Sequence, residues 1–192
     1  GVVPAPDRHG NPDSAYEFDG TARIDTTFTS LPSDFTVSLW ALRDGYDGFH
    51  HAHLIGNNNR QDGWWLNYSQ PANFPNHREG PMFSSGAAEL WAAELSDPQG
   101  SAFEDLTWNH ILVAGSPTRQ EMYINGELVS TLDTSFYEDE SSLPMTIGHV
   151  DAIGETQRYW KGKIDDIRIY DRTLSPREIG LLYNIERPAV ET

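Results

Sequence analysis

The segment WKGKIDDIRIYDR, residues 160–172, decides how the rest of the chain is interpreted. Gly162 opens it, and the isoleucines and Tyr170 give it the β-branched and aromatic character of a long strand. Two neighbouring carboxylates, Asp165 and Asp166, occupy its middle. Because adjacent residues of a strand point to opposite faces, these two carboxylates cannot share one role.

Asp165 is the most informative single residue of this segment. In a regular strand its side chain shares a face with Ile167 and Ile169, and Asp166 lies on the other face. A carboxylate on an apolar face is costly unless it is hydrogen-bonded or binds a metal ion. We therefore expect Asp165 to have such a partner, unless the strand end lets it reach solvent or Arg168.

Size and composition predict one folded domain over residues 1–192. Aromatic residues make up 11% of the chain, which favours a packed core over disorder. The net charge of −16 argues against nucleic acid and anionic membranes as partners. The chain contains no cysteine and no apolar run of transmembrane length. Its abrupt start and loose end suggest one domain of a larger multidomain chain.

Short strands separated by turns are predicted along most of the chain. The strongest signal is FTVSLWAL, residues 35–42, which is apolar on both faces and therefore resembles a central strand. Asn125-Gly126 predicts a tight hairpin turn. We expect Trp40, Trp64 and Trp108 in the core. Further strands are expected near residues 15–18, 22–26, 51–55, 64–68, 88–93, 108–115 and 144–150, and loops at residues 1–14 and 71–86.

One helix is predicted after the last strand. Ser175 precedes Pro176 and Glu178, a pattern typical of a capping box with proline in the first turn. Ile179 and Leu182 then follow at helical spacing. Many strands followed by one helix predict an all-β sandwich with a short C-terminal helix.

These motifs, taken in order, resemble the laminin-G-like jelly-roll family of the concanavalin-A-like lectin/glucanase group. The resemblance rests on FDG, FTVSLW, WNHILVAG, MYINGELV, TIG and WKGKIDDIRIYDRTLSPREI followed by LLYN, and it covers residues from about 13 to 185. It implies two packed antiparallel sheets, one of them curved into a groove. The order and spacing of the motifs are specific for the fold and much less so for function.

The resemblance also implies a structural calcium ion, Ca²⁺, near the first strand turn and the last strand. Carried over to this sequence, it suggests Asp165 as a side-chain ligand, with Asp19 and the Gly20 carbonyl facing it. Oxygen ligands of this kind suit calcium. The loop from Asp7 to Asp13 also offers oxygen ligands, but its spacing does not match the helix-flanked calcium loop, and a polar entry loop is the favoured interpretation.

Enzymes of this group are a further alternative. A retaining glycosidase needs two carboxylates about 5 Å apart. The best match here is Glu89 with Glu94, and their spacing of five places them on opposite faces of a regular strand. The histidines His50, His51 and His53 lie near Tyr46 and could serve acid–base chemistry or zinc. Surface histidines on a polar strand are the favoured interpretation, because no carboxylate lies at a position that would complete a catalytic metal triad.

Sugar binding needs aromatic planes together with hydroxyl-binding polar side chains. Alternation in WWLNY predicts Trp64 and Leu66 in the core and Trp65 on the open face. One neighbourhood of the sequence supplies the predicted ligand-binding set, which is Tyr46, Trp65, Asn57, Arg60 and Asp62. Arg78, Trp91, Arg158 and Tyr159 could contribute from elsewhere.

Three functions are therefore compatible with the sequence. The first is a non-catalytic, lectin-like carbohydrate-binding module with a structural calcium ion, within a larger secreted or cell-surface protein. The second is a protein-binding or structural adhesion domain. The third is a polysaccharide hydrolase or lyase, which the missing strand pattern of carboxylates disfavours. We expect an extracellular or cell-surface location and a polysaccharide or glycan as the main partner.

Overall fold

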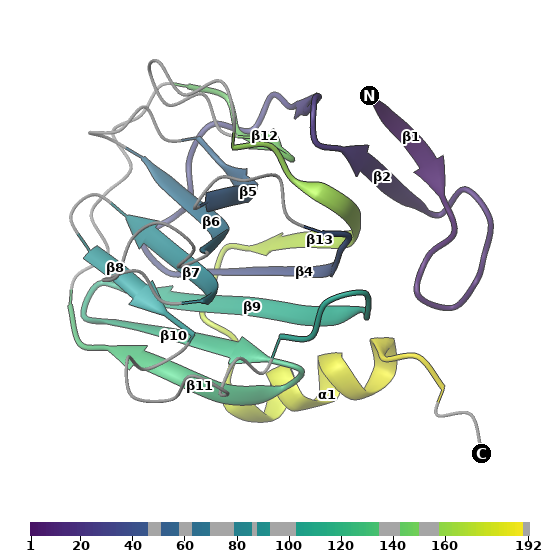
Figure 1. The fold of residues 1–192 in the computed structure, drawn as a ribbon. Coiled ribbons are helices and arrows are strands. Elements are labelled where there is room, and N and C mark those ends of the chain that lie inside the picture. Colours follow the sequence, from purple (N-terminus) through teal and green to yellow (C-terminus); the bar gives the residue numbers. More distant parts are fainter. Residues whose placement is uncertain are drawn as a thin grey trace.

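A computed structural model gives the structure of the chain and describes residues 1–45, 51–57, 63–69, 79–85, 88–92, 103–134, 143–149 and 158–189. In these ranges the strands form two antiparallel sheets that pack face to face, and one helix covers part of the outside of the larger sheet (Figure 1). The predicted fold class, a two-sheet all-β sandwich with a short C-terminal helix, is confirmed.

The two sheets are built from strands that are far apart in the sequence. The described elements are β1 Val2–Ala5, β2 Ala15–Asp19, β3 Ile24–Asp25, β4 Phe35–Arg43, β5 His51–Gly56, β6 Trp64–Ser69, β7 Gly80–Ser85, β8 Ala88–Trp91, β9 Asn109–Ser116, β10 Arg119–Ile124, β11 Glu127–Leu132, β12 Thr146–Ile147, β13 Lys161–Tyr170 and α1 Pro176–Glu186. The larger sheet has the order β1-β2-β13-β4-β9-β10-β11, and the smaller has the order β3-β12-β5-β6-β7-β8.

Strand β4 lies near the middle of the larger sheet and is buried on both faces, as its sequence predicts. Alternate residues, including Phe35 and Leu39, enter the core between the sheets. Trp40 points to the other face, where its indole N–H donates to a carboxylate at the end of α1. Burial on both faces of this strand therefore has two sources, the second sheet and the helix.

The tryptophan predictions are right for two of three positions. Trp64 is fully buried in the core, and Trp40 is equally buried on the helix side of the sheet. Trp108 is only partly buried, so its predicted core position is wrong. Trp108 comes directly before the first residue of β9, so it does not belong to a strand of either sheet.

The hairpin between β10 and β11 has the predicted turn. Asn125 and Gly126 have φ values of 52° and 82°, in the left-handed region that a type I′ turn requires. A Cβ on Gly126 would come within 2.8 Å of the Tyr183 ring of α1. The glycine therefore serves both the turn and the packing of the helix against the hairpin.

Two strands form where the sequence predicts loop. Strand β1 contains Pro4, which is tolerated because β1 is the edge of the larger sheet. Strand β7 lies inside the smaller sheet between β6 and β8, and its Pro81 comes near the strand start. The local sequence pattern does not predict these two strands, because proline normally interrupts the hydrogen-bond ladder of a sheet.

Strand β13 contains a bulge that changes which residues share a face with Asp165. Asp165 pairs with Trp40 and Arg168 pairs with Ser38, so the extra residue lies between them. Asp166 has φ of 47°, as expected for the displaced residue of a bulge. Asp165 consequently shares the helix-facing side of the sheet with Trp40, and the prediction that it shares a face with the following isoleucines is wrong.

Helix α1 has the capping box that the sequence predicts. The Ser175 side chain accepts from the Glu178 backbone N–H, and the Glu178 carboxylate accepts from the Ser175 N–H at 2.8 Å. The helix buries Ile179 against a small cluster that contains Leu112 and Tyr123 of the larger sheet. Within the described residues, no helix has the length and apolarity needed to cross a membrane.

Replacing the cap residue gives a first test of this helix. Ser175→Ala should lower the free energy of unfolding by about 1 kcal/mol, because the first turn loses an acceptor for its free N–H group. Urea unfolding followed by circular dichroism measures the change. Ser175→Asn keeps an acceptor and should retain most of the stability. An equal loss in both variants would show that the cap is not the cause.

Candidate functional site

The outer face of the smaller sheet gathers polar and aromatic side chains from β5, β6 and β7. Its cross-strand pairs are His53 with Asn67, His51 with Ser69, and Trp65 with Ser84. Directly opposed residues of antiparallel strands share a face. The intervening residues of β6 enter the core. We call this surface the polar face, and its members are His51, His53, Trp65, Asn67, Ser69, Met82 and Ser84.

Aromatic rings extend the polar face. The rings of His53 and Trp65 stack with centroids 5.7 Å apart and an interplanar angle of 13°. The His149 ring lies 6.3 Å from that of His53, and the Tyr159 ring stacks on His149 at 4.0 Å. The His53 backbone N–H donates to the Arg158 carbonyl at 3.0 Å, which fixes this segment beside β5.

The rim of the polar face is formed by edge strand β8. Trp91 is paired with Met82 and is partly exposed, and Glu89 is paired with Ser84 and is exposed. The Trp91 indole N–H donates to the Glu89 carboxylate at 3.3 Å. The rim therefore presents an aromatic plane beside a hydrogen-bond acceptor.

The polar side chains at the centre of this face are deeply buried. Asn67 and Ser69 have no exposed surface. Among the described residues, neither the Asn67 amide nor the Ser69 hydroxyl has a hydrogen-bond partner, and the same holds for the indole N–H of Trp65. A buried polar group without a partner costs about 1–3 kcal/mol. Because these three groups are closed to solvent, each needs a partner inside the fold, such as a buried water molecule.

The structure places the predicted ligand-binding residues as follows. Trp65 lies on the open face, as its alternation predicts, and it is partly exposed. Asn57 is 2% exposed, and its amide donates to the Thr29 carbonyl and accepts from the Trp64 N–H at 3.0 Å. Asn57 thus holds a loop to the start of β6, which differs from the predicted role. Tyr46, Arg60 and Asp62 lie outside the described residues, as do His50 and Arg78.

The histidines that alternation places on one face do share it. His51 and His53 both belong to the polar face and are buried. The described part of the chain holds no group of three His, Asp or Glu side chains arranged to bind a metal ion. The stacked arrangement of His53 with Trp65 instead makes the imidazole part of an aromatic surface.

Asp19 and Asp165, the two carboxylates predicted to share a calcium ion, lie apart. Asp19 is opposite Lys161, four residues before Asp165 on β13, which corresponds to about 13 Å along the strand. Its carboxylate accepts from the backbone N–H and hydroxyl of Thr21. The Gly20 carbonyl belongs to the same turn, at the Lys161 end of the strand. The side chains of this set therefore do not fit a shared calcium ion.

An arginine takes the place that was predicted for the metal. It pairs with both neighbouring carboxylates of β13, so the prediction that these two cannot share one role is wrong. Arg8 donates to Asp165 at 2.5 Å and to Asp166 at 2.6 Å, and its Nε donates to the Glu186 carbonyl at 2.6 Å. Arg168 pairs with the Glu186 carboxylate. Burial, followed by the Asp166 charge, raises the pKa of Asp165 above its ordinary value, whereas Arg8 opposes the rise. We call these five residues the Arg8–Glu186 cluster.

The other carboxylate proposed for calcium, Asp7, organises its own loop. It accepts from the backbone N–H of His9 at 2.8 Å and from the backbone and side-chain N–H groups of Asn11 at 2.9 Å. These bonds shape the turn that carries Arg8 towards β13. These contacts agree with the interpretation of residues 7–13 as a polar loop.

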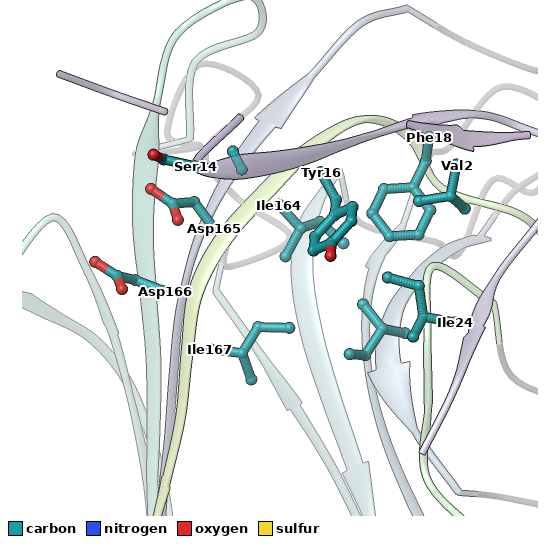
Figure 2. A pocket seen from close by; sticks show the side chains of 11 residues that line it. Val2, Ser14, Tyr16, Phe18, Ile24, Ile164, Asp165, Asp166 and Ile167 are labelled. Atoms are coloured by element: carbon teal, nitrogen blue, oxygen red, sulfur yellow. The ribbon is translucent and has the colours of Figure 1, made fainter. Parts of the chain in front are cut away.

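A cleft of about 620 Å³ opens between β2 and β13 of the larger sheet and β3 and β12 of the smaller sheet (Figure 2). Its walls are apolar and include Phe18, Ile24 and Ile164, which also pack against the core. The charged side chains among its lining residues, Asp165 and Asp166, both accept from Arg8. The cleft is thus an apolar opening of the core, in contrast to the polar face.

Solved structures with the same fold include several carbohydrate-binding proteins. Domain 4 of AbnA, a GH43 extracellular arabinanase from Geobacillus stearothermophilus in complex with arabinotriose, has a TM-score of 0.64 and 20% identity, over 88% of this chain and 76% of that one. The CBM40 of the Ruminococcus gnavus IT-sialidase bound to α2,3-sialyllactose has a TM-score of 0.66 and 13% identity, over 88% and 96%.

A third similar structure is the heptameric SAP-like pentraxin from Limulus polyphemus, with a TM-score of 0.63 and 16% identity, over 89% of this chain and 82% of that one. Among curated proteins, none matches this sequence. Residues 18–180 match the laminin-G family that is described as the Concanavalin A-like lectin/glucanases superfamily. The match spans most of the chain, and the chain therefore belongs to the concanavalin A-like lectin/glucanases superfamily.

Proposed function

We propose that this domain is a non-catalytic carbohydrate-binding module and that its polar face is the glycan-binding surface. The observation that carries the proposal is the row of side chains Trp65, Ser84 and Glu89 across β6, β7 and β8, with a partly exposed indole at one end and an exposed carboxylate at the other. Sugar hydroxyls both donate and accept hydrogen bonds, so a glycan can donate to the carboxylate while one of its rings packs on the indole. The partly exposed Trp65 supplies a plane for the apolar face of a sugar ring.

Two further observations support this reading. The similar structures include one in complex with arabinotriose and one bound to sialyllactose. The first comes from an extracellular enzyme with several domains, which fits an extracellular setting within a larger chain for this domain also. The polar face carries imidazole, amide, hydroxyl and indole groups, and its described carboxylate, Glu89, is held at the rim by Trp91. A retaining glycosidase would instead place two carboxylates about 5 Å apart.

The proposal does not include a calcium ion between Asp19 and Asp165, because Arg8 already neutralises the second carboxylate. Glycan binding should consequently be the same with calcium as with a chelator. A loss of binding in chelator would place a metal ion elsewhere in the chain.

Trp65→Ala should weaken glycan binding about tenfold, because the aromatic plane contributes roughly 1.4 kcal/mol of contact with a sugar ring. Titration calorimetry against arabinotriose, α2,3-sialyllactose, xylotriose and cellotriose measures the affinity. Tyr16→Ala is the matched control, since Tyr16 is an exposed aromatic residue of β2 in the other sheet. Equal affinity in the Trp65 variant and the parent chain would overturn the proposed surface.

The same sugars and their parent polymers distinguish the alternatives. A carbohydrate-binding module leaves polymer length unchanged, so viscosity should stay constant during incubation. Falling viscosity would show a hydrolase or lyase. Binding to none of these glycans would overturn the proposal and favour a protein-binding adhesion domain.

A further inference from the structure

A second, smaller cleft lies on the outside of the larger sheet, next to the end of α1. It has a volume of about 280 Å³. Its walls come from the turn before β9, from the β10–β11 hairpin and from the last turn of the helix. The residues on which its chemistry depends are Glu104, Thr107, Trp108, Tyr183 and Arg187.

Trp108 is the main reason to regard this cleft as a binding site. It is partly exposed and packs in neither of the two hydrophobic clusters that the described residues form. A large aromatic side chain gains most of its stabilisation from burial, so a tryptophan left open at a cleft offers contact area to a ligand. Tyr183 adds a second ring, which is stacked on Trp40 with an interplanar angle of 18° and is thereby held in place.

The wall that carries Trp108 is fixed by its neighbour. The Asn109 side chain donates to the Glu104 carbonyl at 2.8 Å and to the Thr107 carbonyl at 3.0 Å, and accepts from the Glu104 N–H at 3.1 Å. The His110 backbone N–H donates to the Asn125 side chain at 2.9 Å. A surface fixed in this way loses little conformational entropy when a ligand binds.

Charged groups of both signs border the cleft. Glu104 and Arg187 are exposed among its lining residues, and the Arg187 guanidinium lies 6.0 Å from the centre of the Tyr183 ring. A carboxylate accepts from sugar hydroxyls and a guanidinium donates to them. Aromatic planes with one strong acceptor and one strong donor form a chemical match for a neutral sugar ring.

We propose that this cleft is a second carbohydrate-binding site, which takes one sugar ring of a glycan against Trp108. This inference rests on the proposed function of the domain. The polar face lies on the outer side of the smaller sheet, whereas this cleft lies on the outer side of the larger sheet. One domain with both sites binds two glycan segments on opposite sides and can link two chains.

Titration with the trisaccharide that binds best among arabinotriose, α2,3-sialyllactose, xylotriose and cellotriose tests the proposal by stoichiometry. The parent chain should bind two trisaccharides. Trp108→Ala and Trp65→Ala should each keep one site at the parent affinity and weaken the other about tenfold, and the double variant should show both sites weakened. With the parent polymer, the chain should produce turbidity through cross-linking, and each single variant should reduce it. Trp108→Phe keeps a ring at the cleft and should retain two sites, which separates lost binding from lost folding.

The outcomes separate this inference from the proposed function. One site per chain, unaffected by Trp108→Ala and weakened by Trp65→Ala, would overturn the second site and leave the polar face intact. One site weakened by Trp108→Ala alone would support the cleft and overturn the polar face. No binding by the parent chain would overturn both.

Discussion

Arg8→Met is expected to lower the free energy of unfolding by about 3–5 kcal/mol, because it leaves buried carboxylates without their cation. The Arg8 side chain is 5% exposed and the Asp165 side chain 7%. The guanidinium joins the bulge of β13 to the end of α1 and also lies 4.9 Å from the centre of the Trp40 ring. The long, apolar methionine keeps most of the packing volume, so the loss reports on charge. Urea unfolding followed by tryptophan fluorescence measures it.

Two further variants show whether the buried charge is the cause. Arg119→Met removes an exposed arginine that pairs with Glu121 and Asp133, and it should leave the unfolding midpoint nearly unchanged, since solvent screens exposed pairs. Asp165→Asn in the Arg8→Met background should recover part of the stability, because a neutral amide needs no cation. A small effect of Arg8→Met, or no recovery in the double variant, would contradict this account of the cluster.

The Arg8–Glu186 cluster is an example of a structural feature that could not be predicted from the sequence. Strand β4, the Asn125-Gly126 turn and the Ser175 cap were predictable, since each depends on residues within one strand or turn. The bulge at Asp166 adds one residue to a strand and reverses the faces of everything that follows. No periodic pattern shows such an insertion, and Arg8 is 157 residues away from its partner Asp165.

The candidate site was partly predictable for the same reason. Alternation places Trp65 on the open face and puts His51 and His53 on the same face of one strand, and both predictions are confirmed. The same alternation includes Asn67, which became a candidate only when register placed it opposite His53. For Asn57 the sequence did not indicate the structural contacts that the side chain makes, because asparagine in a loop also hydrogen-bonds backbone groups. The contact of Asn57 with the Thr29 carbonyl joins two distant parts of the chain, and no local sequence pattern predicts it.

Acidification from about pH 6.5 to about pH 4 is expected to cost the fold roughly 3 kcal/mol through His110 alone. Burial, followed by the positive charges of Arg8 and Arg168, lowers the pKa of His110 from 6.5 to about 4. The unfolded chain then binds a proton in this range that the folded chain does not, so stability falls as pH falls. The nearby Glu186 carboxylate, 4.0 Å from the imidazole, is held by Arg168 and the Trp40 indole.

The comparison with His110→Gln isolates this contribution. Glutamine keeps a hydrogen-bonding group near Ser38, whose hydroxyl lies 2.8 Å from the imidazole Nε2, but it does not titrate. Unfolding free energies from urea titrations at pH 7.5, 6.5, 5.5 and 4.5 should fall more steeply for the parent chain than for the variant. Asp165 acts in the opposite direction, since its pKa is raised in the folded state, and it contributes equally to both chains. Parallel curves would mean that His110 binds its proton as readily in the folded protein as in the unfolded chain, and they would contradict the lowered pKa.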